Sequence, residues 1–356
     1  MSPAPTPKIL IIRRDNIGDL VCTTPLIAAL RRQFPQAWIG ALVNSYNAPV
    51  LAGNPDLDEI FIYTKAKHRG PGESLPGILW RRLAMMRKLR GMQLDDVIIA
   101  TTSPQPRVVK QAQWLKPKRI IGFGEAEGLD VSLPLDEEGR HEVEDVFRLA
   151  AVYGIAGSPL PCRVFMPVAV TCPRSGIPGT QSEPAPVLCI PSGTLTVGIH
   201  ISARKASQRW PAERFAATIK SLAAQGSLRF MLLWSPGAED NPLHPGDDAK
   251  AAEVQDRVGA GAPVIARPTQ TLAELIAALA QCDALICADG GAMHLAAGLG
   301  LPIVCLFGNS GTARWRPWGV PYRLLQKPSL DVRDIAVDEV TAAFNALRAD
   351  IRAPSS

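Results

Sequence analysis

The sequence lacks several features that would place it in a common protein class. Its 356 residues contain no Cys-x-x-Cys pair, and its seven cysteines are an odd number, several of them within apolar segments. We therefore expect small buried thiols in a reducing compartment, with neither a disulfide framework nor a zinc site. No apolar run approaches the length that spans a bilayer, so any membrane association is expected to be peripheral. Residues 1–7 lack the charged and apolar regions of a signal peptide, and we expect a disordered tail there.

Aromatic side chains and an excess of one charge are also scarce. Aromatic residues make up 6% of the chain, charged residues 20% and hydrophobic residues 47%, which is typical of a soluble α/β protein. The net charge of +5 indicates anionic partners such as nucleotides, phosphorylated glycans or an anionic membrane surface. It is too small for the dense basic face of a nucleic-acid-binding protein, so we expect no nucleic acid partner.

Alternating strand and helix patterns predict an α/β fold with parallel, doubly wound sheets. The chain is longer than a single core usually supports, so two domains are expected, over residues 8–166 and 195–330. A Pro-rich linker is expected at 167–194, and a last helix with a tail at 331–356. No repeat between the two halves is visible in the sequence. In such sheets ligands bind at the carboxyl ends of the strands, so the loops there carry the candidate sites.

The most informative loop lies within Cys282–Ala297. This stretch predicts a buried strand that stops at Asp289, crosses two glycines and continues into a helix with His294 in its first turn. The free N–H groups and the positive dipole end of such a helix favour an anion. We interpret the stretch as a phosphate-binding site flanked by Asp289 and His294. The alternatives are a plain helix cap at Asp289 and an ordinary helical histidine.

A second candidate loop, Arg13–Asp19, follows a predicted strand at Lys8–Ile12 and precedes a predicted helix over Leu20–Gln33. It contains no Gly-x-Gly-x-x-Gly, which argues against a dinucleotide-binding first domain. Its carboxylates, Asp15 and Asp19, are candidates for a general base acting on a hydroxyl. The loop taken alone favours the simpler interpretation that either carboxylate caps the helix.

Two loops of the second half add candidates. The loop Ser202–Arg209 carries hydroxyls and three cations suited to a diphosphate, although a solvated basic loop is the commoner explanation of such charges. Glu239 follows a predicted strand at Leu228–Trp234 and is a candidate partner for ribose hydroxyls. An ordinary surface glutamate is the alternative there.

The basic segment Trp80–Arg90 predicts a helix with Leu83, Met86 and Leu89 on one side. It could rest on anionic headgroups or on a phosphorylated acceptor. A basic, solvated helix that covers the core is the favoured explanation of the segment taken alone.

Four short motifs occur in order along the chain: Arg13-x-x-x-Ile17-Gly18-Asp19-x-x-x-Thr23-Thr24-Pro25, Arg209-Trp210-Pro211, Asp289-Gly-Gly-Ala-Met293-His294-Leu-Ala-Ala, and Leu306-Phe307-Gly308 before Arg314-Trp315. This ordered set resembles glycosyltransferase family 9, the ADP-heptose:lipopolysaccharide heptosyltransferases. The resemblance implies a GT-B fold, in which two Rossmann-like domains face a central cleft. The N-terminal domain would bind the acceptor and the C-terminal domain the nucleotide sugar.

The resemblance also implies the reaction. It is an inverting, metal-independent transfer of heptose, or a similar sugar, from an ADP-sugar to a lipopolysaccharide core or related phosphorylated glycan, without a cofactor. Asp19 matches the general base. The expected donor-binding residues are Ser202, Arg204, Lys205, Arg209, Glu239, Gln270, Asp289, Gly290, Gly291, Met293 and His294. The expected acceptor contacts are Arg13, Lys67 and Arg69.

Two positions differ from the residues that are usual in the family's motifs. Gln208 stands where a lysine is usual, and Gly290 stands where a threonine or serine is usual. Two alternatives therefore stay open: a GT-B enzyme with another nucleotide-sugar donor, such as an epimerase or a different transferase, and a catalytically silent nucleotide- or glycan-binding homologue. The presence of Asp19 together with Asp289 and His294 argues against a catalytically silent homologue. The expected location is the cytoplasm, with peripheral contact at the inner membrane as a further expectation.

Overall fold

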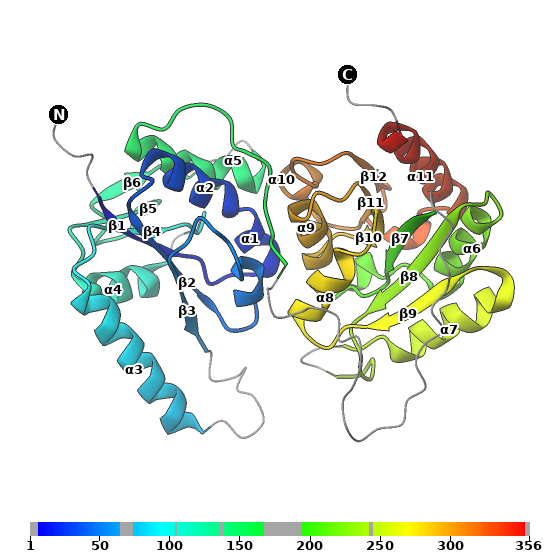
Figure 1. Cartoon of the computed structure of the whole chain (residues 1–356), viewed down its shortest axis with the longest axis horizontal. Helices are drawn as coiled ribbons and strands as arrows, with labels where there is room; N and C mark the ends of the chain where they lie inside the picture. The colour runs from blue at the N-terminus through cyan, green and yellow to red at the C-terminus, as the bar shows by residue number, and fades with distance from the viewer. Residues whose placement is uncertain are drawn as a thin grey trace. The chain divides into compact units, whose positions relative to one another are not determined.

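The computed structural model describes residues 6–64, 74–103, 105–135, 139–166, 194–241 and 245–352, and the chain divides into two compact units (Figure 1). Unit 1 contains the chain up to Phe165 together with two short later stretches, Ala297–Gly300 and Gly311–Val320. Unit 2 contains the rest. Residues 311–320 lie in the part of the sequence expected for the second domain, yet they pack with the first. The linker expected at 167–194 lies almost wholly outside the described residues.

Unit 1 is built on a six-stranded parallel sheet with the order β3-β2-β1-β4-β5-β6. Its strands are β1 (Lys8–Ile12), β2 (Trp38–Asn44), β3 (Glu59–Tyr63), β4 (Asp96–Ile99), β5 (Arg119–Phe123) and β6 (Val131–Leu133). The central strand β1 is buried from Ile9 to Ile12, as a parallel strand covered on both faces must be.

Helices cover both faces of this sheet (Figure 1). The helices of unit 1 are α1 (Ile17–Val21), α2 (Thr24–Gln33), α3 (Leu75–Gly91), α4 (Pro106–Leu115), α5 (Glu142–Phe147) and α10 (Thr312–Trp315). Leu89 of α3 and Val109 of α4 share a core with Leu10 and Ile12 of β1. The helices α2 and α5 lie over the opposite face, where they contact each other (Figure 1).

Unit 2 repeats this design with the sheet order β12-β11-β10-β7-β8-β9, again all parallel. Its strands are β7 (Leu195–His200), β8 (Leu228–Trp234), β9 (Val264–Pro268), β10 (Ala284–Ala288), β11 (Ile303–Phe307) and β12 (Tyr322–Gln326). Its main helices are α6 (Ala212–Ala223), α7 (Asp248–Val258), α8 (Leu272–Leu279), α9 (Gly291–Gly298) and α11 (Val337–Arg352). Phe215, Val254 and Phe344 place α6, α7 and α11 in one core with Val197 of β7.

Both sheets have the Rossmann order, in which the chain starts near the centre and winds outward in both directions. The winding direction reverses between β1 and β4 in unit 1 and between β7 and β10 in unit 2. Ligands of such sheets bind outside the carboxyl ends of the strands at these reversal points. The expected fold class, two Rossmann-like α/β domains of the GT-B type, is confirmed, and it places the candidate loops at both reversal points.

Local differences from the expected elements have physical causes. The single helix expected over Leu20–Gln33 is two helices, α1 and α2. Pro25 lacks an N–H for the helical ladder, and the Thr24 hydroxyl instead donates to the Val21 carbonyl, at 2.7 Å. The helix expected over about Asp331–Arg348 is a short 3-10 turn followed by α11. Among the described residues, no helix is both long and apolar enough to cross a membrane.

Candidate active site

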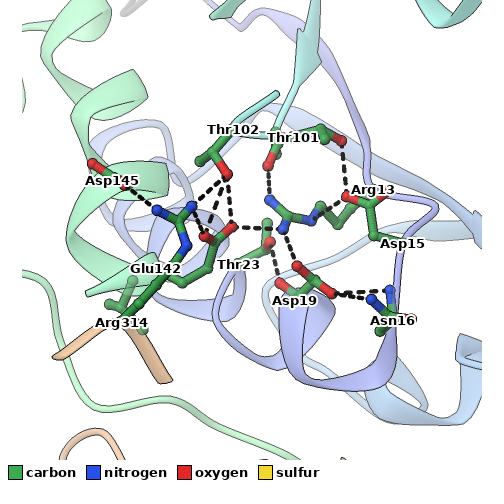
Figure 2. A network of polar contacts seen from close by, with 12 residues as sticks. Arg13, Asp15, Asn16, Asp19, Thr23, Thr101, Thr102, Glu142, Asp145 and Arg314 are labelled. Carbon is green, nitrogen blue, oxygen red and sulfur yellow. Dashed lines mark hydrogen bonds and ion pairs between the residues drawn. The ribbon is translucent and has the colours of Figure 1, made fainter. Parts of the chain in front are cut away.

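Arg13 is the centre of a buried polar network at the end of β1 (Figure 2). Its side chain is 1% exposed, and one terminal nitrogen donates to Asp19 Oδ1 at 2.7 Å and to Glu142 Oε1 at 2.6 Å. The Nε atom lies 3.1 Å from Asp15 Oδ2. Burial alone lowers the pKa of Arg13, but the charges of these three carboxylates outweigh it and raise the pKa. The guanidinium is therefore a fixed positive charge.

Asp19 lies in the first turn of α1 and is 8% exposed. Its Oδ2 atom accepts hydrogen bonds from the backbone and side-chain nitrogens of Asn16, at 3.0 and 2.9 Å. Burial alone raises the pKa of Asp19, but the charge of Arg13 and the Asn16 hydrogen bonds overcome it and lower the pKa. Asp19 is therefore ionised at neutral pH. The capping contact and the general-base role are compatible, because the cap uses Oδ2, while Oδ1 accepts from Arg13 and keeps a second lone pair. The base role stays a prediction at this point.

A second arginine enters the network from α10 (Figure 2). Arg314 donates to Thr102 Oγ1 at 2.9 Å and to Glu142 Oε2, and it lies 3.3 Å from Asp145 Oδ2. Glu142 is 1% exposed and bridges the two arginines. Its position at the first residue of α5 also suits its charge, because the helix dipole is positive there. The network thus combines four sequence-distant segments of unit 1.

The network lines a cavity of about 340 Å³ in unit 1. Its walls include Arg13, Asp15, Asp19, Thr102, Glu142 and Arg314. Hydroxyls, carboxylates and guanidinium groups dominate this lining, so the cavity suits a ligand rich in hydroxyl groups or bearing a phosphate. It opens at the carboxyl ends of β1 and β4, which is the reversal point of this sheet.

A second cluster of polar groups lies at the carboxyl end of β10 in unit 2. Gln208 is 5% exposed, and its side-chain nitrogen donates to Asp289 Oδ2 at 2.7 Å and to Ser310 Oγ at 2.8 Å. Lys205 Nζ lies 3.3 Å from the same Ser310 hydroxyl. One buried amide therefore holds the loops that follow β10 and β11, and it keeps a lysine ammonium beside them.

Close backbone approach shapes this second site. A Cβ atom on Gly308 would lie 2.2 Å from the Ser207 carbonyl oxygen, so only glycine allows the loop after β11 to approach the loop after β7. Gly291 starts α9, and both it and Gly290 are partly exposed. The N-terminus of α9 therefore presents backbone to solvent beside Asp289, as an anion site requires.

Comparison with known proteins assigns the chain to a family. The family model described as glycosyltransferase family 9 (heptosyltransferase) matches residues 82–331. The chain belongs to glycosyltransferase family 9. It is therefore a glycosyltransferase, as the ordered motifs predicted.

Two lipopolysaccharide heptosyltransferases are distant relatives of this chain, at 25% identity or less. The chain is 23% identical over 313 residues to lipopolysaccharide heptosyltransferase 3 of Escherichia coli (strain K12), covering 85% of this chain and 82% of the relative. It is 25% identical over 308 residues to lipopolysaccharide heptosyltransferase 2 of the same strain, covering 85% and 83%.

Solved structures show the same fold. A family 9 glycosyltransferase from Veillonella parvula has a TM-score of 0.75 at 19% identity, with 97% of each chain covered. ADP-heptose lps heptosyltransferase II from E. coli has a TM-score of 0.72 at 21% identity, with 97% of this chain and 100% of that chain covered.

In this family 9 glycosyltransferase, several expected donor residues gather and others do not. Lys205, Asp289, Gly290 and Gly291 belong to the cluster around Gln208 or lie beside it. His294 is 5% exposed on α9, and its backbone N–H donates to the Gly290 carbonyl, at 3.4 Å. Met293 has no exposed surface, and its expected donor contact stays a prediction.

The remaining donor candidates lie elsewhere in unit 2. Arg209 pairs with Glu239 at 2.7 Å, and the side chain of Glu239 is 74% exposed. The Ser202 hydroxyl accepts from the Ser235 backbone N–H at 2.9 Å, which joins the loops after β7 and β8. Arg204 and Gln270 are exposed. Lys205 is thus joined to the Asp289 cluster through Ser310, whereas Arg209 pairs with Glu239.

Of the expected acceptor contacts, Arg13 lines the cavity in unit 1, while Lys67 and Arg69 lie outside the described residues. Among the residues that the structure does describe, no three His, Cys, Asp or Glu side chains gather as a metal site. The expected independence from metal stays a prediction.

The sequence interpretation missed Glu142 as a member of the site and treated Gln208 only as a departure from the family. Glu142 is distant from Arg13 in sequence and follows no glycine-rich or motif-bearing loop, so no local signal identified it. A signal for Gln208 was present, because it stands in the basic loop at a position that is usually charged.

Proposed function

We propose that this glycosyltransferase transfers heptose, or a similar sugar, from an ADP-sugar to a lipopolysaccharide core or related glycan. The transfer inverts the anomeric configuration and needs neither a catalytic metal nor a cofactor. The observation that carries the proposal is the Asp19 carboxylate, which is ionised, oriented by Arg13 and Asn16, and in the wall of a polar cavity. The relatives named as lipopolysaccharide heptosyltransferases support the acceptor class.

At the acceptor side, a sugar hydroxyl enters the cavity and its oxygen attacks the anomeric carbon of the donor. As the new C–O bond forms, the hydroxyl becomes acidic and its proton passes to a carboxylate oxygen of Asp19. The lowered pKa of Asp19 makes it a weak base before attack, so the proton moves late along the reaction. Arg13 and Asn16 hold the carboxylate in place and reduce its freedom to turn.

At the donor side, the bond between the anomeric carbon and the diphosphate oxygen breaks, and negative charge builds up on the leaving ADP. The N–H groups at the start of α9 and the Lys205 ammonium are the groups of unit 2 suited to stabilise that charge. Structures of E. coli heptosyltransferases with ADP, at 16% identity, and with ADP-2-deoxy-2-fluoro heptose, at 18% identity, support the choice of ADP.

The Asp19→Asn variant tests the base. We expect kcat for ADP release from ADP-heptose to fall by about 10²- to 10⁴-fold, because the amide has no basic oxygen of comparable strength. The dissociation constant for ADP, measured by calorimetry, should stay unchanged. Asp15→Asn is the matched control, because Asp15 also pairs with Arg13 and lines the same cavity. Equal rates for the Asp19→Asn variant and the unmodified enzyme would refute the base assignment.

A panel of nucleotide diphosphates and nucleotide sugars tests the donor. We expect ADP and ADP-heptose to bind most tightly in calorimetry, and ADP-heptose to be turned over with a lipopolysaccharide core acceptor. Tighter binding and turnover of another nucleotide sugar would favour the alternative GT-B enzyme. Binding without any turnover would favour the catalytically silent homologue.

A further inference from the structure

The helix α3 exposes an unusual amount of apolar surface for a water-facing helix. Leu75, Leu79, Trp80 and Leu83 are 46%, 60%, 67% and 38% exposed, and all four lie in the first half of the helix. Ile78 and Leu89 are buried and anchor α3 to unit 1. The exposed apolar side chains are therefore additional to those the core uses. Large apolar side chains gathered in this way mark an interaction surface.

The exposed leucines form one stripe. Leu75, Leu79 and Leu83 are four residues apart, so they stack along one side of the helix, and Arg87 continues the same series. Trp80 lies beside them. Figure 1 shows α3 running away from the sheet of unit 1 toward its N-terminal end, so this half of the helix extends beyond the strands.

The charge of α3 has a single sign. The helix contains five cations and no Asp or Glu: Arg81, Arg82, Arg87, Lys88 and Arg90. Arg81, Arg87 and Lys88 are exposed. The guanidinium of Arg90 lies 4.9 Å from the ring centre of Trp114, which is itself 40% exposed on α4. The apolar stripe thus ends at a group of cations and a second exposed tryptophan.

We propose that this surface, formed by Leu75, Leu79, Trp80, Leu83, Arg87 and Trp114, docks unit 1 on an anionic lipid bilayer. The charge and the shape of the surface identify lipid as its binding partner. Leucine and tryptophan side chains enter the boundary between headgroups and acyl chains, while arginine and lysine side chains beside them bind lipid phosphates. A helix with an exposed apolar stripe, several cations and no carboxylate of its own complements an anionic bilayer, because lipid phosphates present negative charge along the whole surface.

Docking goes beyond the proposed function, because it requires neither donor nor acceptor. It also changes the concentration of acceptor that the enzyme meets. A bilayer at α3 keeps the acceptor cavity of unit 1 near lipid-linked substrates, so an acceptor anchored in the membrane reaches a high local concentration.

Flotation with vesicles tests the proposal. The full chain is mixed with vesicles of phosphatidylcholine alone or of an equimolar mixture of phosphatidylcholine and phosphatidylglycerol. We expect binding to the anionic vesicles only, and weaker binding at high salt. The triple variant Leu79→Ser, Trp80→Ser, Leu83→Ser should bind about tenfold or more weakly, because it loses most of the inserted apolar surface. The double variant Arg81→Gln, Arg87→Gln should lose the preference for anionic lipid.

Leu330→Ser is the matched control, because Leu330 lies in unit 2 and is as exposed as Leu75, at 46%. It should bind vesicles as the unmodified chain does. Equal binding by the triple variant and the unmodified chain would overturn the proposal, and so would a lack of binding to anionic vesicles. A dimer that the triple variant loses, without vesicle binding, would assign the surface to a second copy of the chain.

Transfer to a water-soluble acceptor separates this inference from the proposed function. The triple variant should keep the kcat of the unmodified enzyme on an acceptor stripped of its lipid, because no altered residue lines the cavity. An inactive chain that binds anionic vesicles would refute the proposed function and support docking. An active chain that does not bind vesicles would support the proposed function and refute docking.

Discussion

The sites around Asp19 and Asp289 occupy equivalent places in two sheets of the same topology, yet their chemistry differs. In unit 1, Arg13 and Arg314 are compensated by buried carboxylates, so the positive charge is already matched within the protein. In unit 2, Asp289 is held by the neutral amide of Gln208, and Lys205 contacts a hydroxyl. The first arrangement orients a charged side chain of the enzyme. The second leaves positive groups available for the charge of a ligand.

The largest expected difference between the two sites is in stability. Arg13→Met leaves Asp15, Asp19 and Glu142 close together without their shared cation, and we expect a loss of about 3–5 kcal/mol in the free energy of unfolding. Arg209→Met removes the partner of the exposed Glu239 and should cost less than about 1 kcal/mol. Urea unfolding measures both. Equal losses would mean that the network in unit 1 is no more important to the fold than a surface pair.

The pH dependence of stability should reveal a buried histidine beneath the basic loop of unit 2. Burial, and then the nearby charge of Lys250, lower the pKa of His200 to about 4 from its usual 6.5. The unfolded chain therefore binds a proton between these values that the folded chain does not. Stability falls as the pH decreases from 6.5 to 4, by up to about 3 kcal/mol.

Urea unfolding of His200→Gln over the same pH range checks this expectation. The variant carries no titrating group at this position, so its stability should fall less between pH 6.5 and 4 than that of the unmodified chain. Carboxylates with a lowered pKa, such as Asp19, lose their stabilising contribution mainly below their unfolded pKa of 3.8, and that loss should be shared by both proteins. Parallel curves would contradict the role of His200.

The smallest expected effect concerns ligand charge in unit 2. Lys205→Ala should weaken ADP binding by about tenfold, because it removes the ammonium that contacts Ser310 in the Asp289 cluster. Arg204→Ala, which removes an exposed cation next to it in sequence, is the control and should change the dissociation constant far less. Calorimetry at low and high salt measures both variants. If the two variants weaken binding equally, the basic loop acts only as a general positive surface.

Much of the fold could be predicted because the central strands carry a strong local signal. β1 and β10 are almost continuously apolar, and β7 is buried from Thr196 to His200, since both faces of a parallel sheet are buried. The sequence interpretation did not identify β6, β9 and β12. These strands lie at or beside sheet edges and are only partly buried, so their sequences lack that apolar run. The common topology of the two units was also invisible, because it depends on strand order and not on a sequence repeat.

The sequence by itself determined the loops at the strand ends, the candidate base Asp19 and the glycine turn after Asp289, because each depends on residues adjacent in the chain. Only the tertiary structure decided which groups surround them. Glu142 contacts Arg13 from a distant segment and Arg314 contacts Glu142 from another, while the buried amide of Gln208 reaches Asp289 from the loop after the neighbouring strand β7. The physical reason is that ion pairing and hydrogen bonding act through short distances in space, and sequence separation does not determine those distances.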